Sequence, residues 1–216
     1  MRGEAETAVR VEELVLRHPA LSALGPEIRG ACALLIEAFG SGRKVLVCGN
    51  GGSAADADHI VGELMKGFVL ERELPPELRG RLVAQDPDMG GHLARSLQGA
   101  LPAIALTQHI ALSTAFANDA DPTLAFAQQL LGYGVAGDLF WGISTSGNAK
   151  NVLHAAVTAR ALGLKVLGMT GQGGGELAKF CDICIAVPER GTWKVQELHL
   201  PVYHAICLAV EAAFFS

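Results

Sequence analysis

The sequence predicts an α/β fold, a three-layer sandwich in which helices cover both faces of a parallel sheet. Two observations lead to this prediction. Short apolar runs alternate along the chain with segments of helical periodicity, and strands that alternate with helices form parallel sheets. Half of the 216 residues are hydrophobic and only 18% are charged, which suits a well-buried core or an oligomer that hides further apolar surface.

The individual elements follow in chain order. Residues 1–41 are predicted to form two helices with a break at residues 24–27, where Gly and Pro interrupt the pattern. From about Lys194 to Phe215, apolar residues at helical spacing predict a long closing helix. The strands are predicted in five apolar runs: KVLVCG at 44–49, PAIALT at 102–107, GDLFWGIS at 137–144, KVLGMTG at 165–171 and DICIAVP at 182–188.

Residues 68–99 do not fit this alternation, because charges, prolines and glycines mix there with weak helical periodicity. A structureless loop of that length is unusual, so we expect an excursion of a turn and one or two short helices above the sheet. Including this insertion, the chain is expected to form a single domain over residues 1–216.

Composition and charge argue against several classes of partner. With 17 Lys and Arg against 22 Asp and Glu, the net charge of −5 gives no general attraction to nucleic acid or to an anionic membrane. No apolar run approaches the roughly 20 residues that span a bilayer, and residues 1–13 do not resemble a signal peptide. We therefore expect a cytoplasmic protein without nucleic-acid or membrane partners, in which any phosphate is bound locally.

The cysteines lie mostly inside apolar segments, which indicates buried free thiols in a reducing compartment. Cys181 and Cys184 form a CxxC pattern in FCDICIAV. If both belong to one strand, their sulfurs point to opposite faces, so we expect core packing at both positions. The five cysteines are Cys32, Cys48, Cys181, Cys184 and Cys207.

Two strand-to-helix turns have the composition of anion-binding sites. CGNGGSAADA, at 48–57, offers glycines and the free N–H groups of a helix start. GISTSGNAKNVL, at 142–153, adds the hydroxyls of Ser144, Thr145 and Ser146, which can hold a phosphate without Lys or Arg. One of these hydroxyls is expected to be an ordinary N-cap. The first turn lacks the Lys of a Walker loop and departs from GxGxxG, so we expect no nucleotide cofactor.

Two predicted helices carry side chains suited to catalysis or to metal binding. His59 and Glu63 are four residues apart and so share a helix face. The closing helix carries Gln196, His199 and His204. If the helices meet, such a set suits either a divalent metal with N and O ligands or a carboxylate and an imidazole acting as base and acid. A lone helical His is more often structural, so the argument depends on the two helices together.

Five motifs, in this order and spacing, resemble the phosphoheptose isomerase (sedoheptulose-7-phosphate isomerase) family, which has the sugar isomerase (SIS) fold. The resemblance covers nearly the whole chain apart from residues 68–99. The motifs are CGNGGSAADADHIVGEL, the Asn118–Asp119 pair in FANDAD, GISTSGNAKNV, MTGQGGGELA and VQELHLPVYH.

The resemblance implies a five-stranded, flavodoxin-like parallel sheet and a homotetramer with active sites where subunits meet. It also implies aldose–ketose isomerisation of a small phosphorylated sugar through a cis-enediol, with Glu63 and His204 as catalytic residues. One zinc per subunit is implied, with the ligands His59, Glu63, Gln196 and His204. The implied substrate contacts are Asn50, Gly51, Gly52, Ser53, Asn118, Asp119, Ser144, Thr145, Ser146 and Gln196.

Three positions depart from the family pattern. Ala149 stands where the family usually has a serine, so one hydroxyl contact to the phosphate is missing. The basic residue often found after the catalytic glutamate is displaced or absent, with Lys66 and Gly67 in its neighbourhood. The excursion at 68–99 is longer than the usual connection, so it either covers the sugar pocket or extends the subunit interface.

Two other functions are alternatives to the enzyme. A non-catalytic SIS-domain module, such as the replication-initiator-associating type, binds phosphosugar or protein and is expected to lack the acid and base pair. This chain keeps both Glu63 and His204, which favours the enzyme. A sugar-phosphate-sensing regulator usually adds a DNA-binding segment, and the first 40 residues are neither basic nor long enough for one.

Overall fold

The structure is a computed structural model and describes residues 2–216. Its centre is a five-stranded, all-parallel sheet in the order β2-β1-β3-β4-β5, which confirms the predicted α/β fold. Each of the five predicted apolar runs contains one strand. The strands are β1 (Val45–Cys48), β2 (Ala103–Ala105), β3 (Leu139–Ser144), β4 (Lys165–Thr170) and β5 (Ile183–Ala186).

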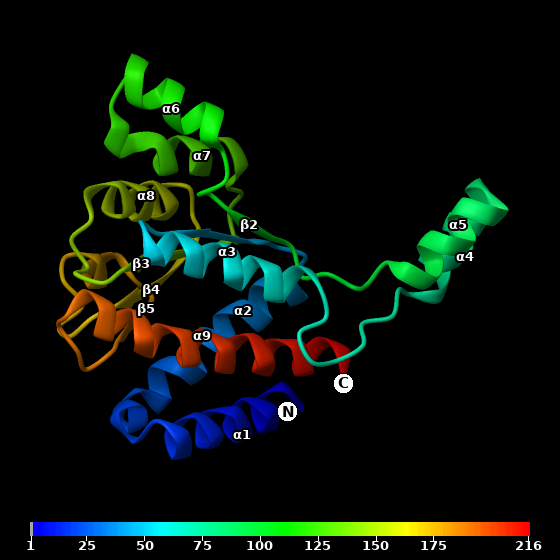
Figure 1. The fold of residues 1–216 in the computed structure, drawn as a ribbon, viewed down its shortest axis with the longest axis horizontal. Coiled ribbons are helices and arrows are strands. Elements are labelled where there is room, and N and C mark those ends of the chain that lie inside the picture. The colour runs from blue at the N-terminus through cyan, green and yellow to red at the C-terminus, as the bar shows by residue number, and fades with distance from the viewer. Residues whose placement is uncertain (1) are drawn as a thin grey trace.

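Helices cover both faces of this sheet (Figure 1), and each face has its own hydrophobic core. Successive strand residues enter opposite cores: Val45 and Val47 belong to one, Leu46 and Cys48 to the other. Because both faces are covered, the strands are apolar throughout instead of alternating with polar residues. One core is built with α1 (Arg2–Arg17), α2 (Gly25–Gly40), α3 (Gly52–Met65) and α9 (Thr192–Phe215), the other with α7 (Ala125–Tyr133) and α8 (Lys150–Ala161).

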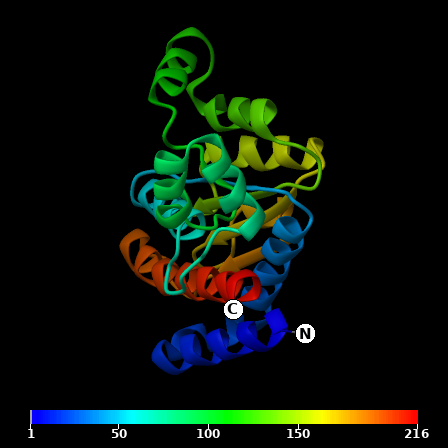
Figure 2. The same cartoon turned by 90° about the vertical axis from the view of Figure 1, so that its right-hand side faces the viewer.

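The outer layers are formed by α1 and by α6 (Ile110–Asp119). In Figures 1 and 2, α1 lies against α9 on one side of the molecule, and α6 lies beyond α7 on the other. No residue of α6 is buried. Three short 3-10 helices complete the chain: η1 (Pro19–Leu24), η2 (Pro122–Leu124) and η3 (Leu177–Phe180).

The break between the N-terminal helices lies earlier than the sequence predicts. The helix α1 ends at Arg17, η1 follows, and the segment 24–27 starts α2 instead of interrupting it. Pro26 lies in the first turn of α2. A proline is compatible with that turn, because the N–H that it lacks has no partner inside the helix there.

The excursion at 68–99 contains two helices, α4 (Pro76–Gln85) and α5 (Pro87–Ser96), packed as a hairpin. We call this hairpin, residues 76–96, the arm, and the two segments that join it to α3 and β2, residues 66–75 and 97–102, its stem. It projects beyond the carboxyl end of α3 instead of lying above the sheet as expected (Figures 1 and 2). The chain then enters β2 at its amino end, so the arm lies at the edge of the sheet opposite to the two glycine turns. Within this chain, the arm does not cover those turns.

Among the described helices, α9 alone is long and apolar enough to cross a membrane, judged by length and composition. The sequence did not predict this, because α9 contains no uninterrupted apolar run of that length. Of its most apolar 18 residues, 56% are buried, and α9 packs against α1, α2 and α3. The core helix of a soluble protein has this environment, so the hydropathy of α9 is weak evidence for a membrane span.

The prediction that Cys181 and Cys184 point to opposite faces of a strand is wrong. Cys181 precedes β5, at the C-cap of η3, so strand periodicity does not apply to it. Both sulfurs face Gly168 on the neighbouring strand β4, so the two thiols lie on the same side of the sheet.

Candidate active site

The two glycine turns lie side by side at the carboxyl edge of the sheet. Strands β1 and β3 are neighbours, but the chain continues from β1 to β2 on one side and from β3 to β4 on the other. In open α/β sheets, the crevice outside such a switch point is where ligands bind, and the strand order seen here is the flavodoxin-like one. The turn at 49–53 follows β1 and the turn at 144–149 follows β3, so both border this crevice.

Hydrogen bonds join the first turn to the helix that follows the second. Asn50 and Asn151 exchange two amide hydrogen bonds of 2.9 and 2.8 Å. Gly51 is the N-cap of α3, and no side chain caps that helix. Ser53 is only 3% exposed and its backbone N–H donates to the Asn50 carbonyl, so it supports the turn from below.

The second turn presents its hydroxyls unequally. Ser144 is the last residue of β3 and is buried, Thr145 is half-buried, and Ser146 is exposed. The hydroxyl of Ser146 accepts a 3.1 Å hydrogen bond from the backbone N–H of Asn148. The expected N-cap hydroxyl is absent, because the N-cap of α8 is Ala149, which makes no side-chain capping bond. In the first turn of α8, the N–H of Val152 donates to Oδ1 of Asn151 at 3.1 Å, while the N-cap residue supplies no acceptor side chain to the N–H groups at the helix start.

Gly147 gives the second turn its shape. Its φ is +67°, and a Cβ there would lie 2.1 Å from the carbonyl oxygen of Gly174. Any larger residue would be strained by the backbone conformation and would also clash with the 171–176 loop. That loop holds the turn in place, since the N–H of Glu176 donates to Oδ1 of Asn148 at 3.0 Å, and the N–H of Leu177, the next residue, donates to the Gly147 carbonyl at 2.9 Å.

The predicted residues of the closing helix separate into three environments. Gln196 packs on the first turn, where a Cβ on Gly52 would lie 2.5 Å from its Nε2. His199 is fully buried, and its Nε2 donates to the Thr170 carbonyl at 3.2 Å. Burial lowers its pKa to about 4, so it is a neutral core residue. Of these three residues, only His204 lies beside His59, and Gln196 contacts the same helix at its first residue.

His59, Glu63 and His204 form a cluster between α3 and α9. The Nε2 of His59 lies 3.1 Å from Oε1 of Glu63, and the ring centroids of His59 and His204 are 5.1 Å apart. Lys66 Nζ lies 3.3 Å from the other oxygen of the Glu63 carboxylate, whose side chain is 12% exposed. The Nε2 of His204 is buried and has no hydrogen-bond partner among the described residues. Such an unpaired atom costs free energy unless a ligand satisfies it.

Burial and nearby charge set the protonation of His204. Desolvation and the neighbouring His59 lower its pKa below the ordinary value for histidine, while Glu63 opposes that shift. Its imidazole is therefore neutral near pH 7, with one ring nitrogen able to accept a proton.

The residues Tyr203 and Asp56 extend this cluster, and sequence reasoning did not find them. The hydroxyl of Tyr203 lies 2.9 Å from His59 Nδ1 and 3.3 Å from Asp56 Oδ1, so His59 is held between Tyr203 and Glu63. Tyr203 is 1% exposed, and burial is the main cause that raises its pKa and that of Asp56. The position of Asp56, three residues before His59, was a usable signal; that of Tyr203 depends on how the helices pack.

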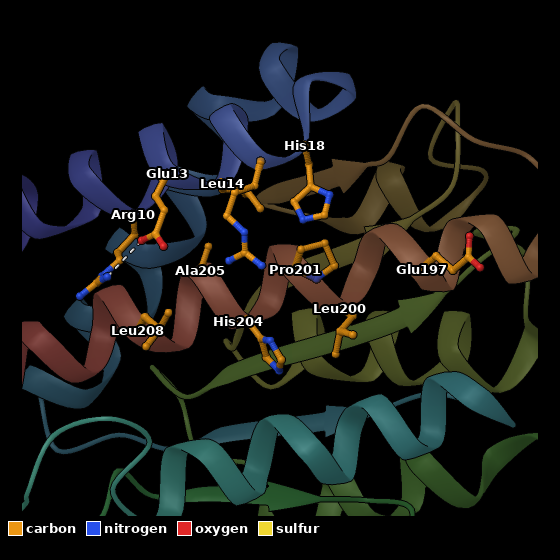
Figure 3. A pocket seen from close by; sticks show the side chains of 11 residues that line it. Arg10, Glu13, Leu14, His18, Glu197, Leu200, Pro201, His204, Ala205 and Leu208 are labelled. Atoms are coloured by element: carbon orange, nitrogen blue, oxygen red, sulfur yellow. Dashed lines mark hydrogen bonds and ion pairs between the residues drawn. The ribbon is translucent and has the colours of Figure 1, made fainter.

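A cavity of about 230 Å³ lies beside this cluster, between α1 and α9 (Figure 3). His204 projects from α9 toward α3, and His18 points from the end of α1 toward α9. Arg10 and Glu13 on α1 are joined by an ion pair of 3.2 Å. The lining residues are Arg10, Glu13, Leu14, Arg17, His18, Glu197, Leu200, Pro201, His204, Ala205 and Leu208.

Asn118 and Asp119 are the last two residues of α6. Asn118 Nδ2 donates to Asp119 Oδ1 at 2.8 Å, and both residues are exposed. Within the described residues of this chain, no hydrogen bond links either of them to the two turns or to the His59 cluster.

The four predicted zinc ligands are not assembled into one site. Three have suitable N and O donors close together, but Gln196 lies eight residues before His204, about 12 Å along the helix. In residues 2–216, no group of three or more His, Cys, Asp or Glu side chains is arranged to hold a metal ion. The donor chemistry therefore fits zinc, while the arrangement of the donors is incomplete in one chain.

Comparison with known proteins gives concordant results. The sequence matches the SIS domain family over residues 15–95 and 84–171. It is 35% identical over 215 residues to the phosphoheptose isomerase of Aneurinibacillus thermoaerophilus, covering 100% of this chain and 94% of the relative. It is 37% identical over 189 residues to that of Synechocystis sp., covering 88% and 84% of the two chains.

The fold comparison agrees with the sequence comparison. The structure of a phosphoheptose isomerase from Neisseria gonorrhoeae superposes with a TM-score of 0.72 at 30% identity. The alignment covers 94% of this chain and 96% of that chain. The similarity thus extends over the whole architecture.

Proposed function

The chain belongs to the phosphoheptose isomerases of the SIS domain family, and on this premise we propose that it interconverts sedoheptulose 7-phosphate and D-glycero-D-manno-heptose 7-phosphate. The observation that carries the proposal is that Glu63 and His204, from α3 and α9, both lie against His59, with Nε2 of His204 left without a hydrogen-bond partner among the described residues. A non-catalytic SIS module has no need of such a pair.

In the proposed reaction, Glu63 removes the proton from the carbon next to the carbonyl, and a cis-enediol forms. Glu63 then returns the proton to the neighbouring carbon. His204 exchanges protons with the two substrate oxygens, since its lowered pKa leaves a nitrogen free to accept one. His59 and Lys66 each contact one oxygen of the Glu63 carboxylate. These contacts fix the orientation of the carboxylate, which acts as the base.

The phosphate is proposed to bind at the turn 144–149, with Ser144, Thr145, Ser146 and the uncapped start of α8 as donors. The sugar chain then extends along Asn50, Gly51, Gly52 and Gln196 toward Glu63. Ser53 supports this edge from a buried position. Asn118 and Asp119 are proposed to contact substrate in the assembled oligomer, since within the described residues of one chain no hydrogen bond links them to the turns or to the His59 cluster.

Zinc is part of this proposal, with His59, Glu63 and His204 as ligands and Gln196 joining when substrate or a neighbouring subunit closes the site. The unpartnered Nε2 of His204 supports it. A bound zinc ion would polarise the substrate carbonyl. The proposal also includes a homotetramer in the cytoplasm and a role in heptose biosynthesis.

The activity can be tested with the purified protein and sedoheptulose 7-phosphate, by following aldose formation with and without added zinc. Glu63→Gln should reduce turnover at least a thousandfold and leave phosphosugar binding within a few-fold, because the base is lost and the contacts remain. Glu73→Gln is the matched control, since the side chain of Glu73 is 74% exposed on the stem of the arm. Unchanged substrate under all conditions, or an active Glu63→Gln variant, would contradict the proposal.

A further inference from the structure

Cys181 and Cys184 form a thiol pair for which the proposed isomerisation has no use. Cys181 lies at the end of η3, and Cys184 lies in β5, the strand at the edge of the sheet. Both are partly exposed, whereas the other three cysteines are buried with at most 1% exposure. The pair is therefore the one place in the described chain where two free thiols meet each other and can be reached from solvent.

The absence of a side chain at Gly168 makes room for the two sulfurs. Gly168 lies directly opposite Cys184 in the β4–β5 register. A Cβ at this position would be 2.5 Å from Sγ of Cys181 and 3.5 Å from Sγ of Cys184. Two sulfurs thus converge above one residue that has no side chain. Any other residue at position 168 would push Cys181 away.

The surroundings shift the pKa values of the two thiols in opposite directions. The neighbouring Cys181 thiol, opposed by burial, lowers the pKa of Cys184 to about 7. Sγ of Cys184 also lies 3.8 Å from the hydroxyl of Thr170. The same contact between the thiols and burial raise the pKa of Cys181, whose Sγ lies 3.2 Å from the Leu177 carbonyl. The thiolate is the nucleophile in sulfur chemistry, so Cys184 is the attacking member and Cys181 the resolving one.

We propose that Cys181 and Cys184 are a thiol–disulfide exchange site that reacts with low-molecular-weight disulfides and closes to an intramolecular disulfide. The Cys184 thiolate attacks one sulfur of the small disulfide, whose S–S bond breaks, and a thiolate leaves and takes up a proton. Cys181 then loses its proton and attacks Sγ of Cys184, which releases the second small thiol. Two protein thiols are oxidised to a disulfide, and one small disulfide is reduced to two thiols.

The test uses the folded, fully reduced protein and excess oxidised glutathione as the probe. After the reaction is quenched with an alkylating reagent, intact and peptide mass spectrometry locate the modified sulfurs. We expect the loss of two hydrogens and a 181–184 cross-link, formed at least about tenfold faster than any reaction at Cys32, Cys48 or Cys207. Circular dichroism is used to check that the protein stays folded during the reaction.

Two variants separate the roles of the thiols. Cys181→Ser should accumulate a lasting glutathione adduct on Cys184, because no resolving thiol remains. Cys184→Ser should react at Cys181 at least about tenfold more slowly, because the pKa of that thiol is raised. Equal reaction rates in the two variants would overturn the proposal. It would also be overturned if the folded wild-type protein kept both thiols while the urea-unfolded protein lost them. None of these readouts depends on the isomerase activity.

Discussion

Tyr203 shows how a single residue can orient the proposed site without touching substrate. Its hydroxyl contacts His59 Nδ1, and its side chain is almost fully buried. Tyr203→Phe should lower kcat about tenfold and leave KM nearly unchanged, because one hydrogen bond that orients His59, and through it Glu63, is lost.

Steady-state kinetics check this prediction, and the chain offers a matched control. Tyr133 makes the same kind of contact, with its hydroxyl 3.0 Å from His109 Nε2, at a position outside the cluster. Tyr133→Phe should leave kcat unchanged. A drop in both variants, or a change in KM alone at Tyr203, would argue against an orienting role.

His199 makes a prediction about pH and stability. Its pKa is about 4 in the folded chain and near the ordinary histidine value when unfolded, so the unfolded state binds more protons between these values. The free energy of unfolding should therefore fall as pH falls, by about 2 kcal/mol between pH 7 and pH 5 from this residue alone. Urea unfolding should show a shallower pH dependence in His199→Gln. An unchanged pH dependence would mean that His199 is not the responsible group.

At the scale of elements, the stem of the arm is fixed by a buried ion pair. Arg72 Nε lies 2.9 Å from Glu211 Oε1, and both side chains are fully buried. Glu211 also accepts backbone hydrogen bonds from residues 68–70, while Arg72 donates to the carbonyls of Glu63 and Leu64. The pair therefore ties α9 and the stem of the arm to the end of α3, next to the proposed base.

Breaking this pair should be costly, because the partner would be left charged and buried. Arg72→Met is expected to lower the free energy of unfolding by about 3–5 kcal/mol. Arg79→Met is the control: its ion pair with Glu73 is exposed, and its loss should cost less than about 1 kcal/mol. Chemical denaturation of both variants measures the difference. Similar costs would show that the Arg72–Glu211 pair is not a structural clamp.

At the scale of the molecule, the arm is the part that contributes almost nothing to the buried core of a single chain. Its helices bury only Gly90 and Gly91, and it exposes apolar side chains such as Val83, Met89 and Leu93. The stem is closed by a 2.7 Å hydrogen bond from the N–H of Gly99 to the carbonyl of Arg72, so residues 76–96 can be replaced by a short linker.

This shortened variant tests the proposed assembly. Light scattering should show a tetramer for the full chain and smaller species for the variant at low concentration, because apolar surface that other subunits would cover is gone. The melting temperature at high concentration should change little. A variant that stays tetrameric at all concentrations would exclude the arm from the interface.

The sequence by itself determined the features that depend on local periodicity. It predicted five strands alternating with helices, the two turns after β1 and β3, and His59 and Glu63 on one helix face, because spacing along one element fixes these relations. The 68–99 excursion was correctly predicted to be partly helical, but its predicted position above the sheet is wrong, since nothing local specifies where an insertion packs.

Only the tertiary structure decided which distant residues meet. It brought His204 rather than His199 to His59, set Gln196 on Gly52, added Tyr203 and Asp56, and placed both sulfurs of Cys181 and Cys184 on one side. The rotation of α9 against α3 determines the contacts of His204, Gln196 and Tyr203. The end of η3 before β5 determines the position of Cys181. Both arise from packing between elements far apart in sequence, so the pattern within either element cannot reveal them.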